Sequence, residues 1–182
     1  ARNSSYLAIG DSVPAGADHD ERDWRYERRM QPDARAYPVE RKPDEAAAMR
    51  PGRSAQGGLV GDRAADHALR MIRIPYRYGG NSPSAGFDCS GLVQFSYKKA
   101  GAILPRTTDA LRQTSAPIRL SNLRRGDLVF FDQGWKKNGH VGIYLGAGEF
   151  IHAPSSGGRV RKDSLQSPYW RKHLSEARRI AV

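Results

Sequence analysis

The sequence predicts an α+β fold, in which helices come first along the chain and strands follow. Apolar residues recur at roughly helical spacing at 62–72 and 89–99. Short apolar, partly β-branched runs typical of strands occur at 128–131, 141–145 and 149–152. These strands are not separated by helices as they would be in βαβ units, so the order of the elements agrees with α+β.

The composition divides the chain into two regions. At 182 residues it is long enough for one domain with a sizeable core. Residues 1–58 contain five prolines, few aliphatic side chains and charges of both signs. We expect them to form a polar linker or extension that is poorly structured, followed by a single domain over 59–182. The single cysteine excludes an internal disulfide and therefore does not indicate a redox compartment.

The charge is concentrated in the second region. From Gly61 onward there are twenty Lys and Arg residues against nine Asp and Glu, so this part carries the whole formal net charge of +11. A basic domain favours an anionic partner. However, the sequence shows neither a basic stripe interleaved with aromatic residues nor a known nucleic-acid-binding motif. We therefore do not expect a nucleic acid as partner. The positive charges either lie on a solvated surface or attract a polymer that carries carboxylates.

The only cysteine, Cys89, stands where a polar, glycine-rich loop changes into a helix. Asp88 is a good N-cap residue, which places Cys89 at about the first helical position. A thiol there faces unsatisfied N–H groups and the positive end of the helix dipole, and both favour the nucleophilic thiolate. The alternative is that this lone cysteine is a small buried hydrophobic residue.

Five histidines are candidates for the base that a cysteine nucleophile needs. His19 lies in a charged segment, His67 in a helix-like run and His173 in an exposed-looking basic run. His140 opens the strand at 141–145, whereas His152 closes the strand at 149–152. The hairpin connection at 146–148 makes these two histidines neighbours, with His140 presented to Cys89 and His152 behind it.

Several short sequence motifs follow one another between residues 62 and 182. They are Tyr-Arg-Tyr-Gly-Gly at 76–80, Phe-Asp-Cys-Ser-Gly-Leu-Val at 87–93, Leu-Pro-Arg-Thr-Thr at 104–108, Leu-Arg-Arg-Gly-Asp-Leu-Val-Phe-Phe at 123–131, Gly-His-Val-Gly-Ile-Tyr at 139–144, Phe-Ile-His-Ala-Pro at 150–154 and Tyr-Trp at 169–170. This series resembles the NlpC/P60 cysteine peptidases of bacterial cell walls.

The resemblance implies a papain-like core, in which the nucleophile helix packs on an antiparallel β-sheet that carries the histidines. It also implies a catalytic triad without metal or cofactor, with Cys89 as nucleophile, His140 as base and His152 as the residue that orients the base. Tyr76 would help to bind the oxyanion. The residues expected to bind substrate are Asp88, Ser90 and Arg77. Asp88 could equally serve only as the helix cap.

For function, the resemblance implies hydrolysis of peptide bonds in peptidoglycan stem peptides. The bond would be the D-Ala–diaminopimelate cross-link or the D-Glu–diaminopimelate bond within a stem. The protein is then expected to be an exported monomer of the cell envelope, in the periplasm or at the outer membrane. A lipid anchor outside this sequence would attach it to the membrane.

Three alternatives use the same residues differently. One cysteine and two histidines could ligate zinc, although the sequence has no Cys pair and no His-x-x-x-His spacing. The domain could bind the wall without hydrolysing it. The thiol could also transfer an acyl group to an amine instead of to water, which the sequence does not exclude.

Overall fold

The computed structural model describes residues 55–155 and 158–182, and its elements follow an α+β order. In chain order they are helix α2 (Ala55–Leu69), strands β1 (Asn81–Ser82) and β2 (Gly86–Phe87), helices α3 (Cys89–Lys99) and α4 (Thr108–Gln113), strand β3 (Ala116–Ile118), the 3-10 helix η1 (Leu120–Asn122), strands β4 (Leu128–Gln133), β5 (Lys136–Gly146), β6 (Glu149–His152) and β7 (Arg161–Ser164), helix α5 (Pro168–His173) and strand β8 (Leu174–Arg179). The linker expected over 1–58 lies outside the described residues, except that 55–58 belong to α2. No helix in the described ranges is long and apolar enough to cross a membrane.

The main sheet has six strands in the order β3-β8-β4-β5-β6-β7, and every neighbouring pair is antiparallel. The strands predicted at 128–131, 141–145 and 149–152 are confirmed as parts of β4, β5 and β6. The polar residues 132–138 lack any strand pattern and favour a loop, but β4 and β5 extend into them. Gln133 pairs with Lys136, so the two strands continue almost to the turn. Backbone pairing carries them through polar residues, which the apolar pattern could not indicate.

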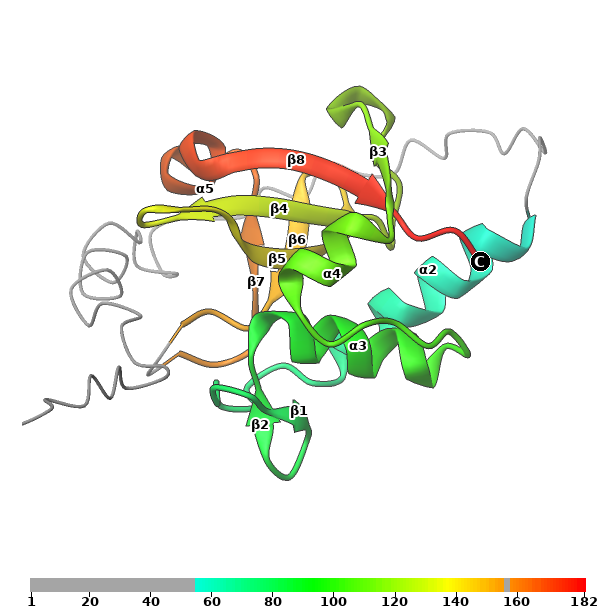
Figure 1. Cartoon of the computed structure of the whole chain (residues 1–182), viewed down its shortest axis with the longest axis vertical. Coiled ribbons are helices and arrows are strands. Elements are labelled where there is room, and N and C mark those ends of the chain that lie inside the picture. Colours follow the sequence, from blue (N-terminus) through cyan, green and yellow to red (C-terminus); the bar gives the residue numbers. More distant parts are fainter. Residues whose placement is uncertain (1–54, 156–157) are drawn as a thin grey trace, which may run out of the picture.

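Side chains alternate between the two faces of the sheet and build two separate cores. One core lies between the sheet and helices α2 and α3, as Figure 1 shows, and includes Phe130, Val141 and Ile151. The other core contains Phe131, Phe150 and Trp170, the last of which comes from the short helix α5. The nucleophile helix is therefore packed on an antiparallel sheet.

The start of α3 lies tightly against the loop that precedes it. Asp88 caps the helix, since its Oδ1 accepts the N–H of Gly91 at 2.7 Å, and Cys89 is the first helical residue as predicted. A Cβ on Gly91 would lie 2.0 Å from the carbonyl oxygen of Gly80. Only glycine allows this approach, which fixes the first turn of α3 and with it the position of the thiol.

Candidate active site

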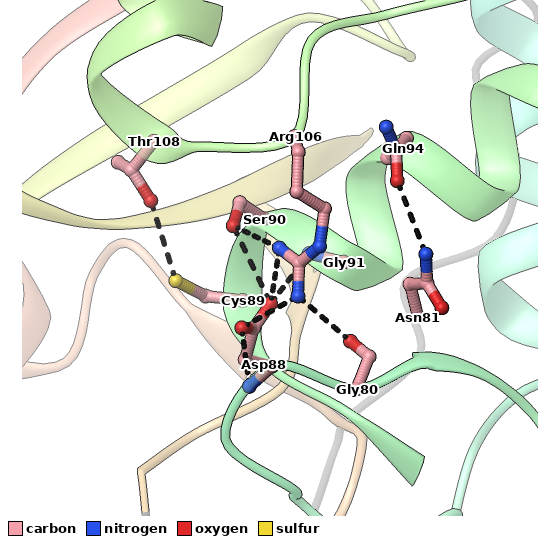
Figure 2. A network of polar contacts seen from close by, with 10 residues as sticks. Gly80, Asn81, Asp88, Cys89, Ser90, Gly91, Gln94, Arg106 and Thr108 are labelled. Atoms are coloured by element: carbon pink, nitrogen blue, oxygen red, sulfur yellow. Dashed lines mark hydrogen bonds and ion pairs between the residues drawn. The ribbon is translucent and has the colours of Figure 1, made fainter. Parts of the chain in front are cut away.

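Cys89 lies where the first turn of α3 meets strand β5. Its Sγ is 3.6 Å from Oγ1 of Thr108 on α4, a contact visible in Figure 2, and the residue is partly exposed. The backbone N–H groups of Val141 and Ser90 also face the sulfur. Val141 directly follows His140, so the thiol contacts the strand that carries the predicted base.

The surroundings of Cys89 favour the neutral thiol, contrary to the expectation that the helix start alone favours the thiolate. Burial raises the pKa of the Cys89 thiol, and the negative charge of Asp88 adds to this effect. The hydrogen bond with Thr108 and the N–H groups of Val141 and Ser90 lower the pKa without cancelling the rise. A base is therefore needed to form the nucleophile.

His140 and His152 are neighbours, as the hairpin predicted. Nε2 of His140 lies 2.8 Å from Nδ1 of His152, and both side chains are buried. The rings meet edge to face with their centroids 5.0 Å apart. Nε2 of His140 is directed to His152, so the other ring nitrogen, Nδ1, points away from His152.

Aromatic rings enclose the two histidines. The Trp170 ring stacks on His140 at a centroid distance of 5.8 Å and meets His152 edge to face at 4.8 Å. Phe131 contacts His140 at 6.0 Å and Phe150 contacts His152 at 4.8 Å. Such ring pairs stabilise defined orientations, so this cluster holds the imidazoles in place.

Gly142 allows the histidines to meet, and its replacement tests this packing. A Cβ at Gly142 would lie 2.8 Å from Cδ2 of Phe150 and 3.4 Å from Cβ of His152. We expect Gly142→Ala to displace His152 and to lower kcat by roughly a hundredfold, with a stability loss of about 1–3 kcal/mol. Steady-state kinetics and thermal unfolding measure both effects.

The matched control is Gly58→Ala, because a Cβ there meets nothing within 4 Å. That variant should keep both the wild-type rate and the wild-type unfolding temperature. Wild-type kcat in Gly142→Ala would contradict the packing argument.

Asp88 forms a dense polar network with Arg106, as Figure 2 shows. The guanidinium donates to Oδ1 at 2.9 Å and to Oδ2 at 2.8 Å, and also to Oγ of Ser90 at 2.8 Å. A bidentate pair of this kind is strong and geometrically defined. The hydrogen bond with Asp88 raises the pKa of Arg106, which stays charged. Asp88 therefore caps the helix and is also neutralised by Arg106.

Arg77, the third residue expected to bind substrate, is directed elsewhere. It is exposed, and a Cβ on Gly86 would lie 2.5 Å from its Cγ, so its stem lies over Gly86. The backbone N–H of Arg77 donates to the carbonyl of Phe87. The structure brings Asp88 and Ser90 together through Arg106 and leaves the Arg77 side chain on the outer side of this loop.

Tyr76 lies close enough to Cys89 and Asp88 for their charges to act on its hydroxyl. Burial raises the pKa of Tyr76 well above its ordinary value, and negative charge on the neighbouring Asp88, or on Cys89 when it is ionised, raises it further. The phenol therefore stays protonated at neutral pH. It keeps an O–H that can donate a hydrogen bond near the thiol.

The other histidines do not join this site. His67 is on the surface of α2, near Arg70, whereas His19 lies outside the described residues. His173 is half-buried, not exposed as expected, because its ring stacks on Tyr169 at 4.3 Å and its Nδ1 is 2.7 Å from the carbonyl oxygen of Tyr169.

The zinc alternative finds no support in the geometry. His140 and His152 direct ring nitrogens at each other instead of at a common point. Within 55–155 and 158–182, no group of three or more His, Cys, Asp or Glu side chains is placed to hold a metal ion.

Sequence reasoning missed three side chains that contact the predicted triad, namely Thr108, Trp170 and Asp163. Oδ2 of Asp163, on strand β7, lies 2.6 Å from Nε2 of His152. No local pattern marks this aspartate, because its strand reads Arg-Lys-Asp-Ser and has no apolar alternation. Thr108 and Trp170 fall within the sequence motifs that carry the family resemblance, but only the tertiary structure shows which residues they contact.

Comparison with known proteins finds named relatives of this chain. The chain is 45% identical over 121 residues to murein DD-endopeptidase MepH of Escherichia coli, covering 64% of this chain and 45% of that protein. It is 43% identical over 115 residues to the bifunctional muramidase/DL-endopeptidase CwlT of Bacillus subtilis, covering 62% and 34%. The chain thus spans less than half of the length of each of these relatives.

The fold also matches a solved structure of a lipoprotein-like NLP/P60 family protein from Staphylococcus aureus Mu50. The TM-score is 0.62 at 34% identity, covering 75% of this chain and 45% of that one. The sequence pattern of the NlpC/P60 family matches residues 73–179, which include Cys89, His140 and His152. The chain therefore belongs to the NlpC/P60 family.

Proposed function

We propose that this protein is a cysteine endopeptidase that cleaves peptide bonds in bacterial peptidoglycan through Cys89, His140 and His152. Two observations carry the proposal. The thiol at the start of α3 faces the backbone N–H of Val141 on β5, and the preceding residue, His140, belongs to a buried histidine pair whose nitrogens are 2.8 Å apart. The relatives named as murein DD-endopeptidase and DL-endopeptidase support the choice of substrate.

In the proposed reaction His140 takes the proton of Cys89, and the sulfur attacks the carbonyl carbon of the substrate. Since burial raises the pKa of this thiol, proton transfer to His140 accompanies attack and a standing thiolate is not required. His140 then gives the proton to the leaving amine, and water hydrolyses the thioester. His152 accepts a hydrogen bond from His140 and fixes its tautomer without adding a negative charge at that point.

Two donors are available for the oxyanion of the tetrahedral intermediate. We assign the backbone N–H of Cys89, at the start of α3, and the hydroxyl of Tyr76. The raised pKa of Tyr76 supports this role, because a phenol that stays protonated remains a donor throughout the reaction.

The polar network beside the thiol supports a cross-link as the preferred bond. Both oxygens of Asp88 already accept hydrogen bonds from Arg106, and Oδ2 also accepts the N–H of Gly79 at 2.9 Å. This neutralised carboxylate offers little attraction for a free terminal amine. We therefore favour the D-Ala–diaminopimelate cross-link of polymeric peptidoglycan, with the D-Glu–diaminopimelate stem bond as the second candidate. Asp88 and Ser90 would contact the substrate peptide, and Arg77 would reach it from the outer side.

The proposed substrate places the protein outside the cytoplasm. Relatives named for murein and peptidoglycan hydrolysis act on the cell wall, so we propose an exported protein of the cell envelope. Attachment as a lipoprotein in the periplasm is the finer proposal, supported by the lipoprotein-like description of the structural relative. The basic surface favours contact with the carboxylates of stem peptides.

The test is mass spectrometry of purified, cross-linked dimeric muropeptides after incubation with the protein, with Cys89→Ala as the control. Monomeric tetrapeptide products are expected. Release of a disaccharide-L-Ala-D-Glu fragment would move the cut into the stem. A product joined to an added amine acceptor would show acyl transfer, and unchanged substrate would refute the proposal.

A further inference from the structure

The hydrogen bonds that begin at His140 do not end at His152. Nε2 of His152 lies 2.6 Å from Oδ2 of Asp163 on β7, and His152 itself is fully buried. We propose that Asp163 is a positioning residue that fixes which ring nitrogens of the histidine pair carry protons. This inference rests on the proposed function. The site would then consist of Cys89, His140, His152 and Asp163.

The register of the sheet places Asp163 beside His152. In the antiparallel pair β6–β7, His152 is opposite Arg161 and Phe150 is opposite Asp163. His152 and Asp163 are therefore diagonal neighbours on the same face, within reach of long side chains. Arg161 donates its Nε–H to the same Oδ2 at 2.8 Å and holds the carboxylate in this position.

The carboxylate gives the hydrogen-bond chain a direction. An ionised aspartate only accepts hydrogen bonds, so Nε2 of His152 must carry the proton between them. In neutral His152 the other nitrogen, Nδ1, is then an acceptor, and His140 must donate to it from Nε2. Neutral His140 consequently carries its lone pair on Nδ1, and this tautomer is the form that can take the proton of Cys89. Without Asp163 either tautomer of the pair could form.

The charges around the pair favour this state. Burial would raise the pKa of Asp163, but the hydrogen bond with His152 and the adjacent Arg161 hold it below its ordinary value. Asp163 is thus ionised at neutral pH. Among the described residues, the titratable and charged groups around His152 are His140 on β5 and Asp163 with Arg161 on β7, while Cys89 on α3 faces the N–H of Val141, the residue after His140. Asp163 supplies the negative charge that stabilises protonated imidazole during proton transfer.

Two substitutions separate the charge of Asp163 from its hydrogen bond. Asp163→Ala removes both, and we expect kcat to fall by roughly tenfold to a hundredfold with KM changed less than about twofold. Asp163→Asn has nearly the same shape, and its side-chain carbonyl can accept the same hydrogen bond, so its loss of kcat should be smaller. In both variants the acid limb of kcat/KM should move to lower pH, because protonated imidazole loses a neighbouring anion.

The matched control is Asp66→Asn. Asp66 is also a carboxylate paired with an arginine, at 2.7 Å from Arg125, but it is exposed and lies on α2. This variant should keep the wild-type kcat and pH profile.

NMR of the imidazole nitrogens reads the tautomers without substrate. In the wild type, Nδ1 of both neutral histidines should lack a proton, and in Asp163→Ala the pair should become a mixture. The inference is overturned if Asp163→Ala leaves both the nitrogen signals and the acid limb of kcat/KM unchanged. A lower kcat together with a lower melting temperature would then show that Asp163 has only a structural role. A protein that cuts no muropeptide yet shows the tautomer change would refute the proposed function and leave Asp163 in its positioning role.

Discussion

Replacing Cys89 by alanine is expected to lower the rate of muropeptide cleavage by at least about a thousandfold. The reason is that no second thiol exists in the chain to take its place. Cys89→Ser keeps a hydroxyl at the same point, but serine is harder to deprotonate and should be nearly as inactive. The rates are measured by chromatography of the products from cross-linked muropeptides.

Both Cys89 variants should remain folded. Asp88 caps α3 through its own side chain and pairs with Arg106, and neither contact depends on the sulfur. As a control, we therefore expect the melting temperatures of both variants to lie within a few degrees of that of the wild type. A loss of less than about tenfold in rate, in a folded variant, would remove Cys89 from the nucleophile role.

Loss of His140 is expected to be as damaging as loss of Cys89. The raised pKa of the thiol means that, without a base, few molecules hold the nucleophilic form at neutral pH. His140→Ala would also leave a cavity beside Phe131 and Trp170. His140→Gln is the cleaner variant, because it fills most of this space and removes only the base.

His152→Ala is the comparison that separates a base from a residue that orients it. Its rate should be strongly reduced but higher than that of either His140 variant, and His152→Asn should recover part of the loss because an amide oxygen can accept from His140. Equal rates for His152→Ala and the wild type would show that the 2.8 Å contact between the histidines has no role in the reaction.

The local sequence pattern was sufficient to predict those parts of the structure that a single segment determines by itself. The cap at Asp88, the helix that begins at Cys89 and the strand that ends at His152 are all as predicted. The contact between His140 and His152 also followed, because a hairpin fixes which residues of two neighbouring strands meet.

The remaining parts of the site depend on tertiary packing. The sequence alone does not tell whether Arg77 or Arg106 pairs with Asp88, although Arg77 is nearer in the chain. The bridge between Tyr76 and Phe87 turns the Arg77 side chain over Gly86, while the 104–108 segment brings Arg106 to the carboxylate. The helix dipole likewise predicted a thiolate, but burial outweighs it, and the degree of burial cannot be known before the helix is packed on the sheet.

The central claim is that Cys89 becomes acylated by a peptidoglycan peptide. Acid-quenching the wild-type protein during turnover of cross-linked muropeptides, followed by peptide mapping with mass spectrometry, measures this directly. We expect the peptide containing Cys89 to carry the acyl part of the cleaved stem. An acyl group on a different residue, or undiminished turnover by Cys89→Ala, would contradict it.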